Sequence, residues 1–190
     1  VIATNTWPIA KVCLRTIDRN KWLDMPAGAA PKGLAAEFQV LANAIRNDQD
    51  PERGYVYIEG GTFDITAGAD GIQAETALTV VGGEIRIESG GGSANSANPR
   101  GAGDWPQWDS PSSDQDGGSA KGLKAGVALT ILGGTISIDS SDDGLHSDDS
   151  LTIGGGQITL ASGDDGIHAD ARLTIDRGDI RITARYEGLE

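Results

Sequence analysis

The sequence contains a single cysteine, Cys13, and its aromatic residues make up only 5% of 190 residues. One cysteine excludes an intrachain disulfide, and few aromatic rings mean that Ile, Leu, Val and Ala build most of the core. No apolar run is long enough to cross a membrane, and no charged segment followed by an apolar one opens the chain. We therefore expect one soluble domain from which any export signal has been removed, with Cys13 as a small buried residue.

Positive charge is also scarce, since 15 Lys and Arg residues face 28 Asp and Glu residues, a formal net charge of −13. Such a chain is a poor partner for nucleic acid, because a phosphate backbone demands a surface rich in Lys and Arg. Residues 1–60 carry seven basic and seven acidic side chains, whereas residues 61–190 carry eight and 21. The surplus in the second part favours cations, or polyanions bridged by cations, as partners.

Glycine is abundant, and its spacing reveals a repeat. Four glycines lie 22 residues apart, each followed by Leu or Ile: Gly122, Gly144, Gly166 and Gly188. An earlier copy around Gly71 precedes the first of them by 51 residues, one unit plus an excess of 29. The excess falls in residues 93–119, which are rich in Ser, Gly, Pro, Asn and Asp. We interpret this segment as a long surface loop that interrupts the repeat without ending it.

Each copy holds two short alternating segments separated by Gly-Gly, and alternation is typical of strands. A 22-residue unit without a helical segment cannot bury its own apolar face, so it becomes stable only by stacking on its copies. The sequence thus predicts an all-β parallel β-helix of about six coils over residues 44–190, with Ile45 aligned to Ile72. Residues 1–43 show no such period and are expected to form a divergent cap or irregular first coils.

Stacking makes residues 22 apart into neighbours, and coils lie roughly 4.8 Å from one another. Two inward ladders are predicted: Ile136, Ile158 and Ile180, and Leu129, Leu151 and Leu173. The same register aligns carboxylates: Asp142 with Asp164, Asp143 with Asp165 and Glu187, Asp148 with Asp170, and Glu75 with Asp48. Like charges at this spacing raise each other's pKa values unless a cation lies between them. Clustered oxygens suit Ca²⁺, so calcium between coils is one interpretation, and turn-forming aspartates facing water are the other.

The two histidines, His146 and His168, also stack, at the ladder position that Gln73 and Lys124 occupy in other coils. Two imidazoles alone do not make a zinc site, although carboxylates nearby would let them bind a transition metal adventitiously. An outward polar ladder is the interpretation that the sequence favours.

Two tryptophans, Trp105 and Trp108, lie in the Gly/Ser-rich insertion, where no strand pattern would bury them. A flat indole face can stack on a sugar ring, so a carbohydrate platform is one interpretation, and folding back to pin the loop is the other. Lys121 and Lys124, with Arg172, lie near the acidic corner. They are candidates to pair with uronic acid carboxylates, or to neutralise neighbouring aspartates.

Several segments, including DGIQAETALTVVGGEIRI, SAKGLKAG, SDDGLHSDDSLTI, SGDDGIHADARLTI and YEGLE, together resemble a bacterial family of carbohydrate-binding domain-containing proteins. The resemblance runs from about Ala44 to Glu190. It implies a right-handed parallel β-helix akin to pectate lyases, Ca²⁺ binding through corner aspartates, and binding of acidic polysaccharide such as polygalacturonate. It extends calcium ligation to Asp142, Asp143, Asp148, Asp164, Asp165 and Asp170, and more weakly to Asp70 and Glu75.

We therefore expect a secreted or cell-surface protein that binds Ca²⁺ and acidic polysaccharide without cleaving it. One alternative is a subunit of an extracellular fibre, stacked head to tail, because the repeat stops in the middle of a coil. A third hypothesis is a calcium-dependent polysaccharide lyase with Lys121 as base. It is disfavoured because stacked carboxylates should raise the pKa of that lysine.

Overall fold

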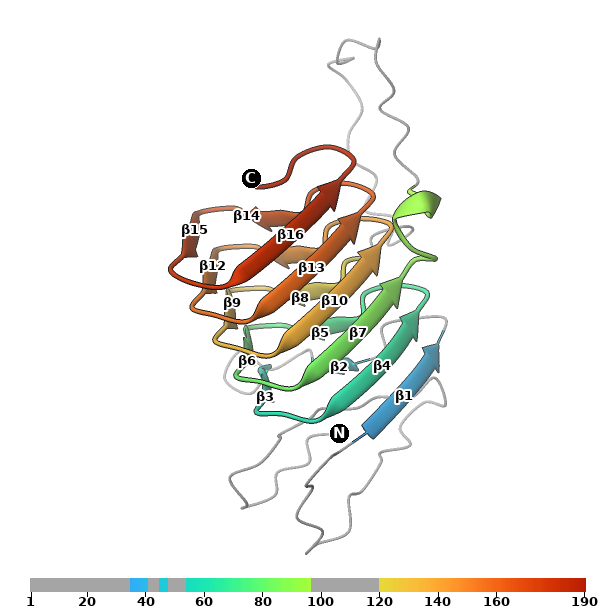
Figure 1. The fold of residues 1–190 in the computed structure, drawn as a ribbon, viewed down its shortest axis with the longest axis horizontal. Coiled ribbons are helices and arrows are strands. Elements are labelled where there is room, and N and C mark those ends of the chain that lie inside the picture. The colour runs from blue at the N-terminus through green and yellow to red at the C-terminus, as the bar shows by residue number, and fades with distance from the viewer. Residues whose placement is uncertain (1–34, 41–44, 48–53, 97–119) are drawn as a thin grey trace, which may run out of the picture.

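The computed structural model describes residues 35–40, 45–47, 54–96 and 120–190, which form a β-solenoid with three parallel sheets (Figure 1). The long strands form a six-stranded sheet in the order β1 (Ala35–Val40), β4 (Thr62–Ala67), β7 (Glu84–Ser89), β10 (Thr135–Ser140), β13 (Gln157–Ser162) and β16 (Asp179–Ala184).

Two sheets of shorter strands close each coil. The first contains β2 (Ile45–Asn47), β5 (Ile72–Ala74), β8 (Leu123–Ala125), β11 (Leu145–Ser147) and β14 (Ile167–Ala169). The second contains β3 (Val56–Ile58), β6 (Ala77–Val80), β9 (Ala128–Ile131), β12 (Ser150–Ile153) and β15 (Arg172–Ile175). The described residues therefore form five three-stranded coils preceded by β1, which confirms the parallel β-helix of about 22-residue coils; about six had been predicted.

The register of the coils follows the 22-residue spacing throughout. Ile136 pairs with Ile158 and Ile158 with Ile180, and the Leu129, Leu151 and Leu173 ladder pairs in the same way. Ile45 pairs with Ile72, as the partial first copy predicts. β1, in the segment where a cap or irregular coils were expected, pairs with β4 along its full length.

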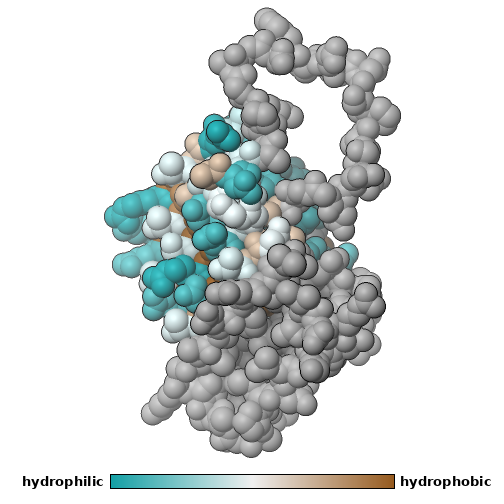
Figure 2. Space-filling model, turned by 90° about the vertical axis from the view of Figure 1, so that its right-hand side faces the viewer, coloured by the Kyte–Doolittle hydropathy of each residue, from teal (hydrophilic) through white to brown (hydrophobic). Residues whose placement is uncertain are grey.

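Alternation within each strand builds the core. Every second side chain points inward and is buried, as in β4 and β7, while the side chains between face solvent. Stacked columns of Ile, Leu, Val and Ala fill the interior, and Phe63 is the one aromatic ring among the buried side chains that the structure describes. Figure 2 shows one outer face of the molecule. Its described surface is mainly hydrophilic or neutral, with small hydrophobic areas among the polar side chains.

The turn before each long strand depends on glycine. Gly134 and Gly156 adopt φ values of 98° and 105°, in the left-handed region that side-chain-bearing residues avoid. The Gly-Gly pair therefore turns the chain tightly from the second short strand into the long one at the same place in successive coils.

The insertion leaves the register of the coils intact. β7 pairs with β10 and β5 with β8, although 51 residues separate the partners instead of 22. Its first residues form a 3₁₀ turn, Ser93–Asn95, beside the following coils: Ser93 N–H donates to Asp139 Oδ1 (2.6 Å), and Ser96 Oγ donates to Gly163 O (2.9 Å). Residues 97–119, with Trp105 and Trp108, lie outside the described residues, as does Asp48.

Helical structure plays almost no part in this architecture. In the part of the chain that the structure describes, no helix has the length and apolar character needed to cross a bilayer.

Candidate functional site

The acidic corner lies between the end of a long strand and the start of the next short strand. After each long strand from β4 to β16, one corner residue is followed by glycine. The residues before those glycines are Asp70, Lys121, Asp143, Asp165 and Glu187. Only glycine fits at the junction, because a Cβ on Gly122 would lie 2.5 Å from Gly144 O and one on Gly144 would lie 2.6 Å from Gly166 O. The glycine lets adjacent backbones approach, and this brings the preceding side chains of successive coils together.

One carboxylate oxygen of each corner aspartate binds the backbone of the next coil. Asp70 Oδ1 accepts a hydrogen bond from Lys121 N–H (2.8 Å), Asp143 Oδ1 from Asp165 N–H (3.1 Å), and Asp165 Oδ1 from Glu187 N–H (3.0 Å). All three aspartates are buried. Each aspartate therefore holds the backbone of the next coil with one carboxylate oxygen, and its other oxygen can contact other groups.

Lys121 interrupts this pattern by placing a cation where other coils carry a carboxylate. Its side chain is buried, and Nζ donates to Asp142 Oδ2 (2.9 Å) and Asp143 Oδ2 (2.6 Å). Burial alone would lower the pKa of Lys121, but the charges and hydrogen bonds of Asp143 and Asp142 outweigh it and raise that pKa. The expectation that neighbouring carboxylates raise the pKa of this lysine is confirmed, and the group remains an ammonium.

The stacked carboxylates do not all respond alike. Burial opposes ionisation of Asp143, but hydrogen bonds from His146, Lys121 and the Asp165 backbone, with the charge of Lys121, hold the Asp143 pKa well below its ordinary value. Asp143 meets the exception that was stated for a cation between the carboxylates, because Lys121 lies against it. The expected rise in pKa is confirmed at Asp164, whose pKa is raised by partial burial and then by the charges of Asp165, Asp143 and Asp142. The difference arises because Asp143 receives hydrogen bonds from His146 and Lys121 directly.

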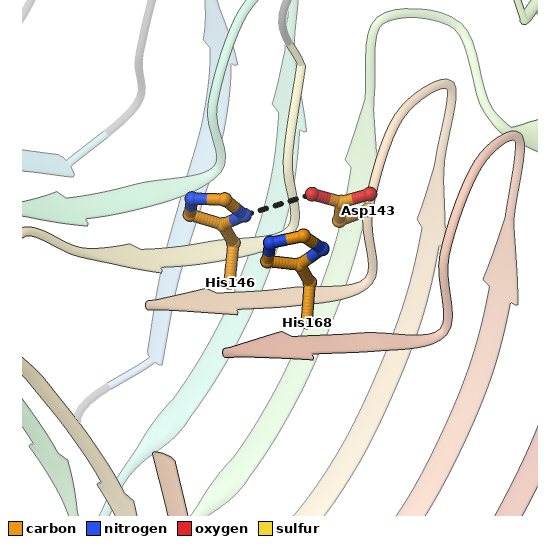
Figure 3. A group of neighbouring side chains, drawn as sticks. All are labelled: Asp143, His146 and His168. Carbon is orange, nitrogen blue, oxygen red and sulfur yellow. Dashed lines mark hydrogen bonds and ion pairs between the residues drawn. The ribbon is translucent and has the colours of Figure 1, made fainter. Parts of the chain in front are cut away.

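The histidine ladder lies beside the corner, on β11 and β14 (Figure 3). The His146 and His168 rings stack with centroids 4.9 Å apart and planes 16° from parallel. His146 contacts Asp143 Oδ2 through Nδ1 (2.9 Å) and Asp148 Oδ1 through Nε2 (2.8 Å). In the next coil, Nδ1 of His168 lies 3.3 Å from Asp165 Oδ2, and Nε2 lies 2.9 Å from Asp170 Oδ1.

His168 has a further carboxylate neighbour, Glu190, whose Oε2 lies 2.8 Å from Nδ1. Burial would lower the pKa of His168, but hydrogen bonds to Asp170 and Asp165 and the charges of Asp143 and Glu190 together raise it. The predicted stacking of the histidines is confirmed, and Lys124 and Gln73 continue the same ladder in the preceding coils.

The structure brings three of the eight predicted calcium ligands together. One carboxylate oxygen each from Asp142, Asp143 and Asp164 lies within 4.8 Å of the others. Asp165 caps Glu187 and contacts His168. Asp148 and Asp170 are exposed and lie beyond the other end of the short strands, where they contact the histidines. Glu75 is exposed at the same position in an earlier coil. Asp70 is buried and accepts a hydrogen bond from Lys121 N–H.

A buried serine ladder at the end of the long strands was not predicted. Ser89 Oγ donates to Ala120 O (3.0 Å), Ser140 Oγ to Asp142 O (3.0 Å), and Ser162 Oγ to Asp164 O (3.4 Å). These bonds tie the ends of the long strands to corner carbonyls and hold the Asp-bearing loops in place. The signal was present in the sequence, since the three serines follow the same spacing as the glycines.

The chain matches a known protein family. A family model described as "Carbohydrate-binding domain-containing protein" matches residues 35–166, which is more than half of the chain and spans β1 to the corner at Gly166. The comparison with curated proteins gave no match, and neither did that with solved structures.

Proposed function

The chain belongs to the carbohydrate-binding domain-containing protein family, and on that basis we propose that it binds an acidic polysaccharide, without cleaving it, through Ca²⁺ held at the acidic corner. The observation that carries this proposal is the cluster of Asp142, Asp143 and Asp164 oxygens within 4.8 Å of one another. Oxygen donors at this density suit Ca²⁺, which takes six to eight of them.

The charge balance of the cluster supports a bound cation. Among the residues that the structure describes, the ammonium of Lys121 is the one that contacts these three carboxylates, and it binds Asp142 and Asp143. Asp164 has no such partner among the contacts described above, and its pKa is raised first by partial burial and then by the negative charges of Asp165, Asp143 and Asp142. A divalent cation beside Asp164 would remove that repulsion. When bound, Ca²⁺ would supply open coordination positions for uronate carboxylates, which is why the proposed ligand is an acidic polymer.

In this proposal, the exposure of Lys121 and Lys124 decides which of the two contacts the sugar. Lys121 is 8% exposed and its ammonium is held by two carboxylates, so in this proposal it balances charge within the corner. Lys124 is less buried and lies on the outward ladder beside the histidines, where a uronate carboxylate can reach it. Trp105 and Trp108 stay candidates for sugar stacking.

The state of Lys121 supports a binding role without catalysis. A lyase needs a base that is unprotonated near neutral pH, whereas the raised pKa of Lys121 keeps it protonated. We propose an extracellular or cell-surface location, because calcium there reaches the roughly 10⁻⁴–10⁻³ M range in which weak sites fill.

The test is binding of polygalacturonate and of a neutral galactan, measured by calorimetry with calcium and again with chelator. We expect calcium-dependent binding of polygalacturonate alone, weakened at least tenfold in Asp164→Asn. Asp64→Asn is the matched control, since Asp64 is an exposed carboxylate on the face of the long sheet. Equal binding of both polymers, or binding that chelator does not weaken, would overturn the proposal.

A further inference from the structure

The histidine ladder forms a second cluster whose chemistry differs from that of the carboxylate cluster. One ligand atom each of Asp143, His146 and His168 lies within 4.8 Å of the others, and Asp165 Oδ2 lies 3.3 Å from His168 Nδ1. In Figure 3 the two rings lie face to face, with the Asp143 carboxylate beside them. Two imidazoles from adjacent coils thus lie beside corner carboxylates, and His168 belongs to a second group of potential ligands with Asp165 and Glu190.

The outer nitrogen of each ring supplies an independent observation. Nε2 of His146 lies 2.8 Å from Asp148 Oδ1, and Nε2 of His168 lies 2.9 Å from Asp170 Oδ1. Histidines that ligate a metal almost always donate their other ring N–H to a carboxylate, a carbonyl or water, and this fixes the tautomer and the ring orientation. The same arrangement occurs twice, in two successive coils, with both Nδ1 atoms near corner carboxylates.

We propose that His146 and His168, with Asp143 and Asp165, form an inter-coil site for a divalent transition metal of the Zn²⁺ or Cu²⁺ type. Imidazole nitrogen with carboxylate oxygen is a donor set that suits these ions, whereas Ca²⁺ takes oxygen ligands. The ion replaces the protons on the two Nδ1 atoms, while the Nε2–H groups continue to donate to Asp148 and Asp170.

The dimensions of the site agree with this assignment. Bond lengths of 2.0–2.2 Å to zinc imply separations of about 3.3–3.5 Å between ligands of a tetrahedral ion. The His–Asp pairs within each coil, at 2.9 and 3.3 Å, are already near this spacing. The two ring centroids are 4.9 Å apart with planes 16° from parallel, so the rings must tilt toward each other for both Nδ1 atoms to reach one ion.

Charge also permits a divalent ion. The Asp143 and Asp165 carboxylates carry two negative charges, and Lys121 retains Asp142 Oδ2 at 2.9 Å when the ion takes Asp143 Oδ2. Glu190 Oε2, 2.8 Å from His168 Nδ1, supplies another oxygen on the far side. The site shares one carboxylate, Asp143, with the proposed calcium cluster and takes its nitrogen ligands from outside it.

The experiment titrates the chelator-treated chain with Zn²⁺ by calorimetry and with Cu²⁺ by electron paramagnetic resonance, in which coordinated imidazole nitrogens split the signal. We expect one ion per chain with two imidazole nitrogens. His146→Gln should weaken Zn²⁺ binding at least tenfold and remove one nitrogen coupling. Asp148→Asn should weaken it by about 10- to 100-fold while both couplings persist.

The variants are chosen so that the fold survives. Gln is the residue that the repeat itself carries at position 73 of this ladder, and circular dichroism verifies each variant. Asp64→Asn is the control for diffuse binding by an acidic surface and should bind like the unsubstituted chain. Unchanged Zn²⁺ affinity in both His146→Gln and His168→Gln, or a Cu²⁺ spectrum without imidazole coupling, would overturn the proposal and leave the histidines as a polar ladder. Calcium-dependent polysaccharide binding is measured separately, so the two proposals can fail independently.

Discussion

Two corners of the same repeat, one at Lys121 and one at Asp165, balance their charge in different ways. Both precede a glycine that contacts the next coil, and both sit at the same register. Lys121 places an ammonium against Asp142 and Asp143, whereas Asp165 adds a carboxylate beside Asp164. The comparison teaches that the backbone of a coil fixes where the corner side chain lies but leaves its charge free to vary.

Removing the internal cation should have the largest effect. Lys121→Ala leaves Asp142 and Asp143 near each other without their ammonium, and breaking a buried ion pair costs about 3–5 kcal/mol. Chemical denaturation with chelator present measures the loss. Arg86→Ala, which removes an exposed partner of Glu84 at 3.5 Å, is the control and should cost about 1 kcal/mol or less. Equal losses in the two variants would show that Lys121 does not stabilise its corner.

Disturbing the backbone that both corners share should have the next largest effect. A Cβ on Gly144 would lie 2.6 Å from Gly166 O, so Gly144→Ala forces the coils apart at a cost of about 1–3 kcal/mol. Gly60→Ala is the matched control, since no atom lies within 4 Å of the Cβ it would add. Thermal unfolding of the two variants should differ by several degrees. If both unfold at the same temperature, close backbone contact is not what requires glycine at the corner.

Replacing the lysine of one corner by aspartate should make the stability of that corner depend on calcium. Lys121→Asp removes the ammonium and adds a carboxylate beside Asp142 and Asp143. The increase in Tm on adding about 1 mM calcium should then exceed that of the unsubstituted chain by a few degrees. Scanning calorimetry with calcium and with chelator measures both increases. An equal increase in the two proteins would mean that calcium binds elsewhere.

The smallest effect concerns Asp164 and has a defined sign. Its pKa is raised in the folded chain, so its ionised form is destabilising above that pKa, and the penalty disappears as pH falls and the carboxyl protonates. In chelator near neutral pH, Asp164→Asn should raise Tm slightly, within the change of about 0.5 kcal/mol usual for surface substitutions. The gain should vanish below the ordinary pKa of 3.8. A variant less stable than the parent at neutral pH would contradict this account.

The fold was predictable because a repeat converts spacing into contact. Once Ile136, Ile158 and Ile180 are 22 residues apart on strands of the same pattern, stacking alone makes them neighbours. The electrostatics of the corner were less predictable. The low pKa of Asp143 depends on its hydrogen bond to His146 and on the direction in which the Lys121 side chain points, and the spacing of the repeat carries no information on side-chain direction.

The contacts of Asp148 and Asp170 were less predictable than the fold but more predictable than the pKa of Asp143. His146 precedes Asp148 by two residues, and His168 precedes Asp170 by two, a separation that puts side chains on the same face of a strand. The two-residue spacing therefore predicts both His–Asp pairs. Treating all corner aspartates as one class of calcium ligand concealed this, because it compared residues only between coils and not along each strand.

The unbroken register across the insertion has an evolutionary consequence. Because β7 pairs with β10 over its full length and β6 with β9 across the added residues, changes of length at this junction shift no later residue out of its ladder. Mutation can therefore lengthen, shorten or replace the inserted segment while selection on the core continues to act coil by coil. Homologues should vary most in length at this junction, and specificity can diverge among them there without a new fold having to arise.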